Sequence, residues 1–326
     1  MKKYIIASLL ILGFSIAEAK TTGGGPSLFS KEPSLEMYPW LTGPLLAPSS
    51  HNVPYGHVNI EPYLYWTQYR GIYDNNWKFA AQHHFTVYTL SVPLQFGILP
   101  YTEFDISPQA YYSYSQGQSS LQFADLPLAL SFQLLNDKPG KPWPPAIKLR
   151  FGANAPTGKF DHLKPSKQGT DQSGIGSWYP GVGLVFGNLF HLSGSHFLAL
   201  RYFFNYNIPV GASVRGSNIY GGTTKTRGTI YPGAGFTANL GLEYSISQPW
   251  TLALDILYNY QAKNRFSGYD GGAPMTSPSS ANYSLAPAIE YNFSDTIGLI
   301  GGSWFTIAGR NTAQFINFIL ALNVYI

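Results

Sequence analysis

Charged side chains are scarce in this chain, and those within its alternating segments fall on one side of the pattern. Only 11% of the 326 residues are Asp, Glu, Lys or Arg. An isolated charge in a narrow, low-dielectric interior is costly unless it is paired. We therefore expect Lys148 and Arg150 to bond to carboxylates on neighbouring strands. The cluster either fills and ties an interior or forms a polar constriction that filters solutes. Its members are Glu61, Glu103, Asp105, Asp125, Lys148, Arg150, Arg201, Glu243, Asp255 and Glu290.

Catalytic and metal-binding patterns are missing from the sequence. Cysteine is absent, which excludes Cys-based metal or redox chemistry, and neither G-x-S-x-G nor H-E-x-x-H occurs. The adjacent His83 and His84 would face opposite sides of a strand and so rarely share a metal ion. Asp74, Asp161, Asp171 and Asp270 fall in expected outer loops, where some barrel proteases carry catalytic acids, but none has a placed His partner. We therefore expect no enzyme, no cofactor and no metal site.

The segments that would carry these charges alternate strictly between apolar and polar residues. Residues 282–293 read NYSLAPAIEYNF, and the last fourteen residues repeat the pattern. Successive strand side chains point to opposite faces, so one face is wholly apolar and the other is polar or small. A soluble sandwich would normally carry Lys and Glu on its polar face. The pattern instead predicts an all-β transmembrane barrel, with lipid outside and a wet interior.

Twelve such segments predict an antiparallel up-and-down barrel over residues 58–326. Short connections alternate with long ones that are rich in Gly, Ser, Thr and Asn, most clearly at 157–176, 209–232 and 262–281. Outer-membrane barrels have short periplasmic turns and long external loops, so we expect both termini in the periplasm. The expected strands are 58–69, 84–96, 102–114, 120–135, 146–156, 177–188, 196–208, 233–246, 250–261, 282–293, 296–308 and 313–326.

The first 57 residues divide into two parts. Residues 1–19 read as a secretory signal peptide, with Lys2 and Lys3, an apolar run and an A-x-A site at Ala17 to Ala19. Residues 20–57 are rich in Gly and Pro and do not alternate. They form either a disordered periplasmic leader or a plug that enters the barrel. The candidate plug residues are Met37, Trp40, Leu41, Leu45 and Leu46.

Aromatic residues make up 16% of the chain, and the alternation places several of them inside the barrel. A general diffusion porin lines its pore mostly with charges, whereas rings with few charges suit less polar solutes. The rings expected to point inward are Tyr63, Tyr65, Tyr111, Phe123 and Phe203.

Two stretches of the chain carry a family resemblance. Residues 125–135 read DLPLALSFQLL, and after a proline-rich turn IKLRF at 147–151 leads to APTG at 155–158. These residues, together with FGILPYTEF at 96–104, resemble the "MetA-pathway of phenol degradation" family of outer-membrane proteins, and the likeness runs loosely from about residue 58 to the C-terminus. Ser131-Phe132 replaces the family's usual Lys-Tyr, and Ile326 stands where barrels commonly end in Phe. The resemblance implies an outer-membrane channel for small aromatic or hydrophobic compounds.

These observations predict a channel in the bacterial outer membrane for passive transport of small hydrophobic or aromatic solutes. The expected partners are outer-membrane lipids, the barrel-assembly machinery and the solute. A formal net charge of +4 is too small to indicate nucleic acid. The alternative is a closed structural or adhesive surface barrel that binds through its long external loops. A barrel enzyme that acts on lipid or peptide is the least favoured interpretation.

Overall fold

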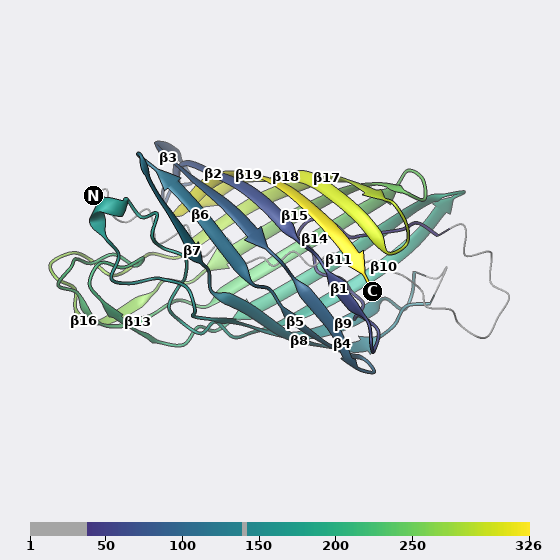
Figure 1. Cartoon of the computed structure of the whole chain (residues 1–326), viewed down its shortest axis with the longest axis horizontal. Coiled ribbons are helices and arrows are strands. Elements are labelled where there is room, and N and C mark those ends of the chain that lie inside the picture. Colours follow the sequence, from purple (N-terminus) through teal and green to yellow (C-terminus); the bar gives the residue numbers. More distant parts are fainter. Residues whose placement is uncertain (1–37, 139–141) are drawn as a thin grey trace.

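The computed structural model describes residues 38–138 and 142–326, which form a closed antiparallel barrel with long loops at one end (Figure 1). One sheet joins sixteen strand segments, and β1 pairs with β19 to close it. The expected twelve-stranded barrel is confirmed, because four wall strands each consist of two segments. The expected signal peptide and Met37 lie outside the described residues. No helix among those residues is long and apolar enough to cross a membrane.

The strand bounds agree with the expected ones to within a few residues over most of the wall. Two strand starts differ by several residues. The second wall strand begins at residue 79, where the sequence predicts 84, and the sixth begins at residue 181, where the sequence predicts 177. The elements are β1 (Val58–Ile60), β2 (Tyr63–Tyr73), β3 (Phe79–Ser91), β4 (Leu94–Leu99), β5 (Thr102–Ile106), β6 (Gln109–Ser115), β7 (Gln118–Phe123), β8 (Leu126–Leu135), β9 (Ala146–Ala155), η3 (Pro165–Lys167), β10 (Gly181–Ser193), β11 (His196–Asn207), β12 (Ala212–Arg215), β13 (Arg227–Tyr231), β14 (Gly235–Ser245), β15 (Trp250–Gln261), β16 (Arg265–Tyr269), β17 (Ser280–Asn292), β18 (Ile297–Arg310) and β19 (Thr312–Tyr325).

Proline residues interrupt four neighbouring wall strands at one level. The breaks fall at Pro62, Pro93 and Pro108, and just before Pro127. Proline has no N–H to donate to a ladder, so a strand that contains one is broken or bulged there. Backbone bonds join successive breaks, from the N–H of residues 61, 92 and 107 to the carbonyls of Pro93, Pro108 and Pro127 at 2.9–3.0 Å. The wall therefore bends along one row.

The outer face of the barrel is apolar, and aromatic rings form a row across β19, β2, β3 and β6. Trp66 packs on Tyr88 at 6.4 Å and on Phe318 at 5.4 Å, and Tyr88 packs on Tyr112 at 6.2 Å between ring centroids. All four side chains are exposed in the isolated chain. Exposed rings at one level are typical of the aromatic girdle of a barrel in lipid.

The expected inward position of Phe123 is wrong. Its side chain is 80% exposed, whereas Ala124 and Asp125 are both buried. The break between β7 and β8 places two consecutive residues inside, which shifts the alternation by one position. Of the other rings expected inside, Tyr63 and Tyr111 are buried, and Tyr65 packs against the lumen cluster.

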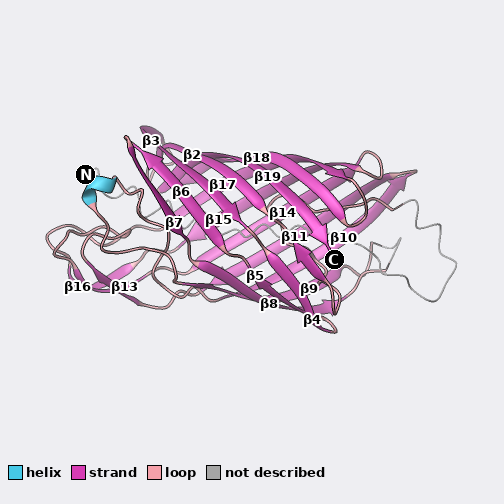
Figure 2. Ribbon diagram, viewed as in Figure 1, coloured by secondary structure: helices cyan, strands magenta, loops and turns pink. Residues whose placement is uncertain are grey.

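Three long connections form a folded cap at the end opposite the C-terminus (Figure 2). We call residues 156–180, 208–234 and 262–279 the loop cap. The sequence predicted loops there, but β12, β13 and β16 form a separate three-stranded sheet. Its buried face carries Val214 and Ile230 and packs with Ile175, Tyr220 and Met275. Apolar burial therefore holds the loop cap together.

Candidate functional site

Residues 38–53, which we call the inner segment, lie against the inner wall of the barrel. Leu41, Leu45 and Leu46 are at most 2% exposed. The backbone N–H and hydroxyl of Thr42 donate to Glu290 Oε2 on β17 at 3.1 and 2.7 Å. Trp40 accepts a bond from the Asn292 amide through its carbonyl at 2.6 Å. An irregular segment inside a barrel needs such partners, because its backbone groups have no ladder.

Asp255 on β15 binds the middle of the inner segment. Its carboxylate accepts the N–H of Leu46 at 3.1 Å, the N–H of Ala47 at 2.9 Å and the Asn239 amide at 3.0 Å. The carboxylate is fully buried. Charge-assisted bonds of this kind are stronger than neutral ones, so Asp255 is a main anchor of the inner segment.

Glu103 and Gln133 hold the end of the inner segment. The Glu103 carboxylate accepts a hydrogen bond from the N–H of Val53. It also forms an ion pair with Lys148, 3.0 Å away, and both charged side chains are fully buried. Gln133 accepts the N–H of Asn52 at 2.7 Å and donates to the Ser50 carbonyl at 2.9 Å. The segment is therefore bonded to the wall along its whole described length.

Glycines in the wall leave room for the inner segment. A Cβ added at Gly241 would meet Pro44 at 2.7 Å and Ala47 at 2.8 Å, and one at Gly302 would meet Leu45 at 2.7 Å. Contacts under 3.0 Å essentially never occur for real Cβ atoms. The wall and the inner segment are thus complementary in shape as well as in hydrogen bonding.

The cations of the wall form three ion pairs, whose partners correct the sequence-based expectation. Arg150 pairs with Asp105 at 3.3 Å, and Arg201 pairs with Glu243 at 2.9 Å. We expected Lys148 and Arg150 on β9 to bond to adjacent strands, but their partners lie on β5, beyond β8. Ser131 on the intervening strand β8 is the register partner of both Glu103 and Arg150. Its short side chain leaves room for the long cations of β9 to reach the carboxylates of β5.

Asp125 is the one member of the predicted cluster that lies away from the others. It sits at the break between β7 and β8, and its carboxylate accepts the N–H groups of Gly158 and Ile175, each at 2.8 Å. Asp125 therefore ties the loop cap to the wall. Glu61 is buried beside Asn59, whose amide donates to it at 2.6 Å.

An apolar zone of the lumen includes part of the inner segment. Leu45 and Leu46 pack into a buried cluster with Tyr63, Trp304 and Phe315. The Trp304 N–H donates to Ser284 Oγ at 2.9 Å, so the ring is fixed in place. Rings and leucines together make this part of the lumen less polar than the part that contains the three ion pairs of Lys148, Arg150 and Arg201.

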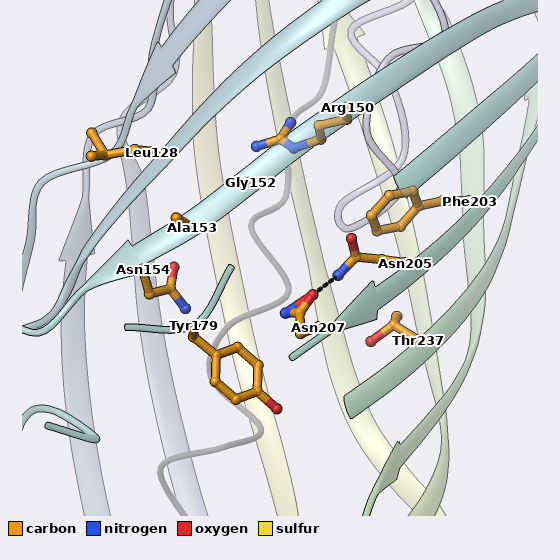
Figure 3. Close-up of a pocket in the computed structure, with 10 residues that line it drawn as sticks. All are labelled: Leu128, Arg150, Gly152, Ala153, Asn154, Tyr179, Phe203, Asn205, Asn207 and Thr237. Atoms are coloured by element: carbon orange, nitrogen blue, oxygen red, sulfur yellow. Dashed lines mark hydrogen bonds between the residues drawn. The ribbon is translucent and has the colours of Figure 1, made fainter. Parts of the chain in front are cut away.

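A recess of about 540 Å³, including space open to solvent, is lined by residues of β8, β9, β11 and β14 and by Tyr179 of the loop cap (Figure 3). The Asn205 amide donates to Asn207 Oδ1, and Phe203 and Tyr179 supply rings. The Tyr179 hydroxyl donates to Gln261 at 2.7 Å, and burial raises the pKa of Tyr179 to about 12, so the phenol stays neutral. This recess combines aromatic surface and uncharged amides with one cation, Arg150, which is ion-paired with Asp105.

Sequence reasoning singled out most of the charged residues but missed the neutral partners. Thr42, Gln133, Asn239 and Asn292 carry no local signal, because their role depends on neighbours far away in the chain. Within residues 38–138 and 142–326 there is no group of three or more His, Asp or Glu side chains that could hold a metal ion.

Comparisons with known proteins place this architecture among outer-membrane barrels. No family model matches the sequence, and no curated protein does. The "COG4313 outer membrane channel from Pseudomonas putida F1" is 13% identical, with a TM-score of 0.66, over 91% of this chain and all of that one. The "TodX monoaromatic hydrocarbon channel" mutant is 11% identical, with a TM-score of 0.35, over 98% of both chains. The chain therefore has the fold of an outer-membrane β-barrel.

Proposed function

We propose that this protein is an outer-membrane channel for passive transport of small hydrophobic or aromatic solutes, and that the inner segment is its plug. The observation that carries the proposal is the bonding of the inner segment to Glu290, Asp255 and Glu103 across the lumen. A leader exposed to the periplasm has no use for this set of partners. We propose that in this conformation the plug obstructs the end of the barrel at which the C-terminus lies.

The lining of the recess supports the proposed class of solute. The recess offers Phe203 and Tyr179 beside uncharged amides and the ion-paired Arg150. Removal of the plug would in addition uncover the buried rings of Tyr63, Trp304 and Phe315, which pack with Leu45 and Leu46. The wall cations there are already paired with carboxylates. Such a path favours an uncharged solute with an apolar ring or chain. The likeness in fold to an outer-membrane channel supports this proposal.

The second candidate is a closed structural or adhesive barrel that binds through its external loops. It is favoured by the fully buried Lys148–Glu103 pair and by the folded loop cap, both of which would suit a permanent seal. In either case the outer face requires outer-membrane lipid, and we propose that the assembly machinery for such barrels inserts the chain.

The two candidates differ in what happens when the plug is removed. Residues 38–50 are replaced by a Gly-Ser linker of equal length, and single-channel conductance is measured in planar bilayers. We expect conductance to rise several-fold and uptake of an uncharged aromatic probe into liposomes to accelerate. Unchanged conductance and uptake would favour the permanently closed barrel.

A smaller change tests the same point without removing any chain. Gly241→Ala places a Cβ against Pro44 and Ala47 and should displace the plug, whereas Gly301→Ala meets only Leu320 Cδ1 at 3.6 Å and Ile319 O at 3.9 Å. We expect Gly241→Ala to raise the conductance and the Gly301→Ala control to leave it unchanged. Equal conductance in both variants would contradict the assignment of the inner segment as a plug.

A further inference from the structure

The exposed face of the small sheet in the loop cap carries an organised set of polar side chains. We call it the arginine face, and its register forms three rows across β12, β13 and β16. One row holds Arg215, Arg227 and Tyr269; the next holds Ser213, Thr229 and Ser267; the last holds Tyr231 and Arg265. The arginines and both tyrosines are exposed, while Val214 and Ile230 on the opposite face are fully buried.

Two cations of this face lie directly opposite each other. Arg215 and Arg227 are cross-strand partners, so their Cβ atoms are about 5 Å apart, and like charges in this position destabilise a sheet. Within residues 38–138 and 142–326, neither guanidinium has a carboxylate partner. An anion between them would turn the repulsion into two charge-assisted bonds.

Asp161 and Asp270 of the loop cap accept backbone N–H groups, and no ion pair joins either of them to Arg215 or Arg227 in the described part of the chain. Asp161 accepts the N–H of Arg215 at 3.0 Å, and Asp270 accepts the N–H of Gly272 at 2.9 Å. The three strands themselves contain no Asp or Glu. The loop cap as a whole has eight Lys and Arg residues against three Asp. Its charge is therefore complementary to an anionic partner.

The rest of the face suits sugar rings. Three hydroxyl side chains lie in the row beside the arginine pair, and they can both donate and accept. Tyr231 and Tyr269 offer flat apolar surfaces with polar tips, and the Arg265 guanidinium lies 6.0 Å from the centre of the Tyr231 ring. Guanidinium groups bind phosphate through two parallel bonds, which fixes its orientation.

We propose that the arginine face binds the phosphorylated core sugars of lipopolysaccharide. Arg215 and Arg227 hold a phosphate, the central hydroxyls bond to the sugar, and the tyrosines pack on its rings. The small sheet lies at the end of the molecule opposite the C-terminus, beyond the barrel strands (Figure 1). The proposal rests on the proposed outer-membrane channel with both termini in the periplasm, the orientation that the alternation of short and long connections predicts; this end then projects from the cell surface, where such sugars are located.

Binding is tested with the full chain in neutral detergent and with core oligosaccharide freed of its lipid, so that the barrel's apolar face cannot contribute. Calorimetry compares this probe with the same oligosaccharide after dephosphorylation and with inorganic phosphate. We expect the phosphorylated oligosaccharide to bind at least about tenfold more tightly than either, because phosphate and sugar contacts act together. Equal affinity for the dephosphorylated probe, or for inorganic phosphate, would overturn the proposal.

Paired substitutions identify the face. Arg215→Gln with Arg227→Gln should weaken binding of the oligosaccharide about tenfold or more, and Arg215→Lys with Arg227→Lys should weaken it less. The matched control, Arg70→Gln with Lys78→Gln, removes the same charge from the exposed β2–β3 hairpin and should change affinity less than about twofold. Equal losses in the Gln pair and its control would show a diffuse charge effect and refute a site.

Folding and channel activity are measured on the same variants. The substituted side chains are exposed, so the heat-dependent shift on a detergent gel and the conductance should match those of the unaltered protein. A loss of oligosaccharide binding with unchanged conductance separates this site from the transport path. Tyr269→Ala should weaken binding of the oligosaccharide without affecting that of inorganic phosphate; an unchanged affinity for the oligosaccharide would contradict the role of the ring.

Discussion

The inner segment, which we propose as the closure of the lower end of the barrel near the C-terminus, and the loop cap at the opposite, upper end are held by different interactions. At the lower end an irregular segment is held by buried carboxylates and amides of the wall, and Leu45 and Leu46 add apolar contacts. At the upper end loops from three connections fold over one another and bury Val214, Ile230 and Tyr220. The lower closure thus depends on buried charged groups at single positions, whereas the upper closure spreads its apolar contacts over three connections and is tied to the wall at Asp125. A single substitution should disturb the first far more than the second.

The largest expected effect is the loss of the buried Lys148 charge. Lys148→Met leaves the Glu103 carboxylate buried without its cation and should destabilise the barrel by roughly 3–5 kcal/mol. Urea unfolding of the protein in vesicles measures this change. Adding Glu103→Gln to Lys148→Met should recover part of the stability, since no charge remains buried there. A double variant as unstable as Lys148→Met would contradict this account of the lower closure.

Removing the Asp255 carboxylate should have the next largest effect. Asp255→Ala leaves the N–H groups of Leu46 and Ala47 and the Asn239 amide without an acceptor, at a cost of about 2 kcal/mol. The plug should also dissociate more often, which noise analysis of single-channel currents detects. A variant with unaltered stability and current noise would mean that Asp255 does not anchor the plug.

Disturbing the upper closure should leave the barrel largely intact. Ile230→Ala opens a cavity in the loop cap, yet the unfolding free energy of the barrel should fall by less than about 1 kcal/mol, because the cap can open locally. Trypsin should then cleave the cap faster, and hydrogen exchange should rise in β13 but not in β15. Exchange that rises equally in both strands would show that cap and barrel unfold as one unit.

The smallest effect concerns Phe123, which sharpens the position of the strand break. Because its ring points outward and is largely exposed, Phe123→Tyr should change the unfolding free energy by no more than about 0.5 kcal/mol. The matched change Phe315→Tyr adds a hydroxyl to a ring that is 2% exposed in the lumen, and should cost more. A larger loss for Phe123→Tyr would restore the inward orientation that the sequence suggested.

The sequence was sufficient to predict the wall wherever alternation is unbroken. β15 and β17 pair through twelve consecutive register positions, and Asp255 and Glu290 are both buried as the pattern requires. The breaks near Pro62, Pro93, Pro108 and Pro127 were missed, although a proline inside a strand pattern is a local signal for them. Phe123 was therefore assigned to the wrong face.

Pairings between distant segments could not be predicted. β13 and β16 each have only five residues, and the wall strands β14 and β15 lie between them in the chain. They pair only after the barrel has brought their two connections together, so their sequences read as loops. The partners of Leu46 and Thr42 are 209 and 248 positions away. Periodicity identifies which face a residue occupies, but it does not specify which buried acid meets which backbone N–H.

The long separation between the plug and its anchors also determines the order of events during synthesis and insertion. Asp255 and Glu290 emerge more than two hundred residues after the segment that they bind. β1 and β2 likewise must wait for β19, the last strand, before the ring can close. Contacts of such high sequence separation form slowly. A chain that lacks its last strands can therefore form neither a complete wall nor a fully anchored plug, so an unfinished barrel would be recognisable by its leakiness.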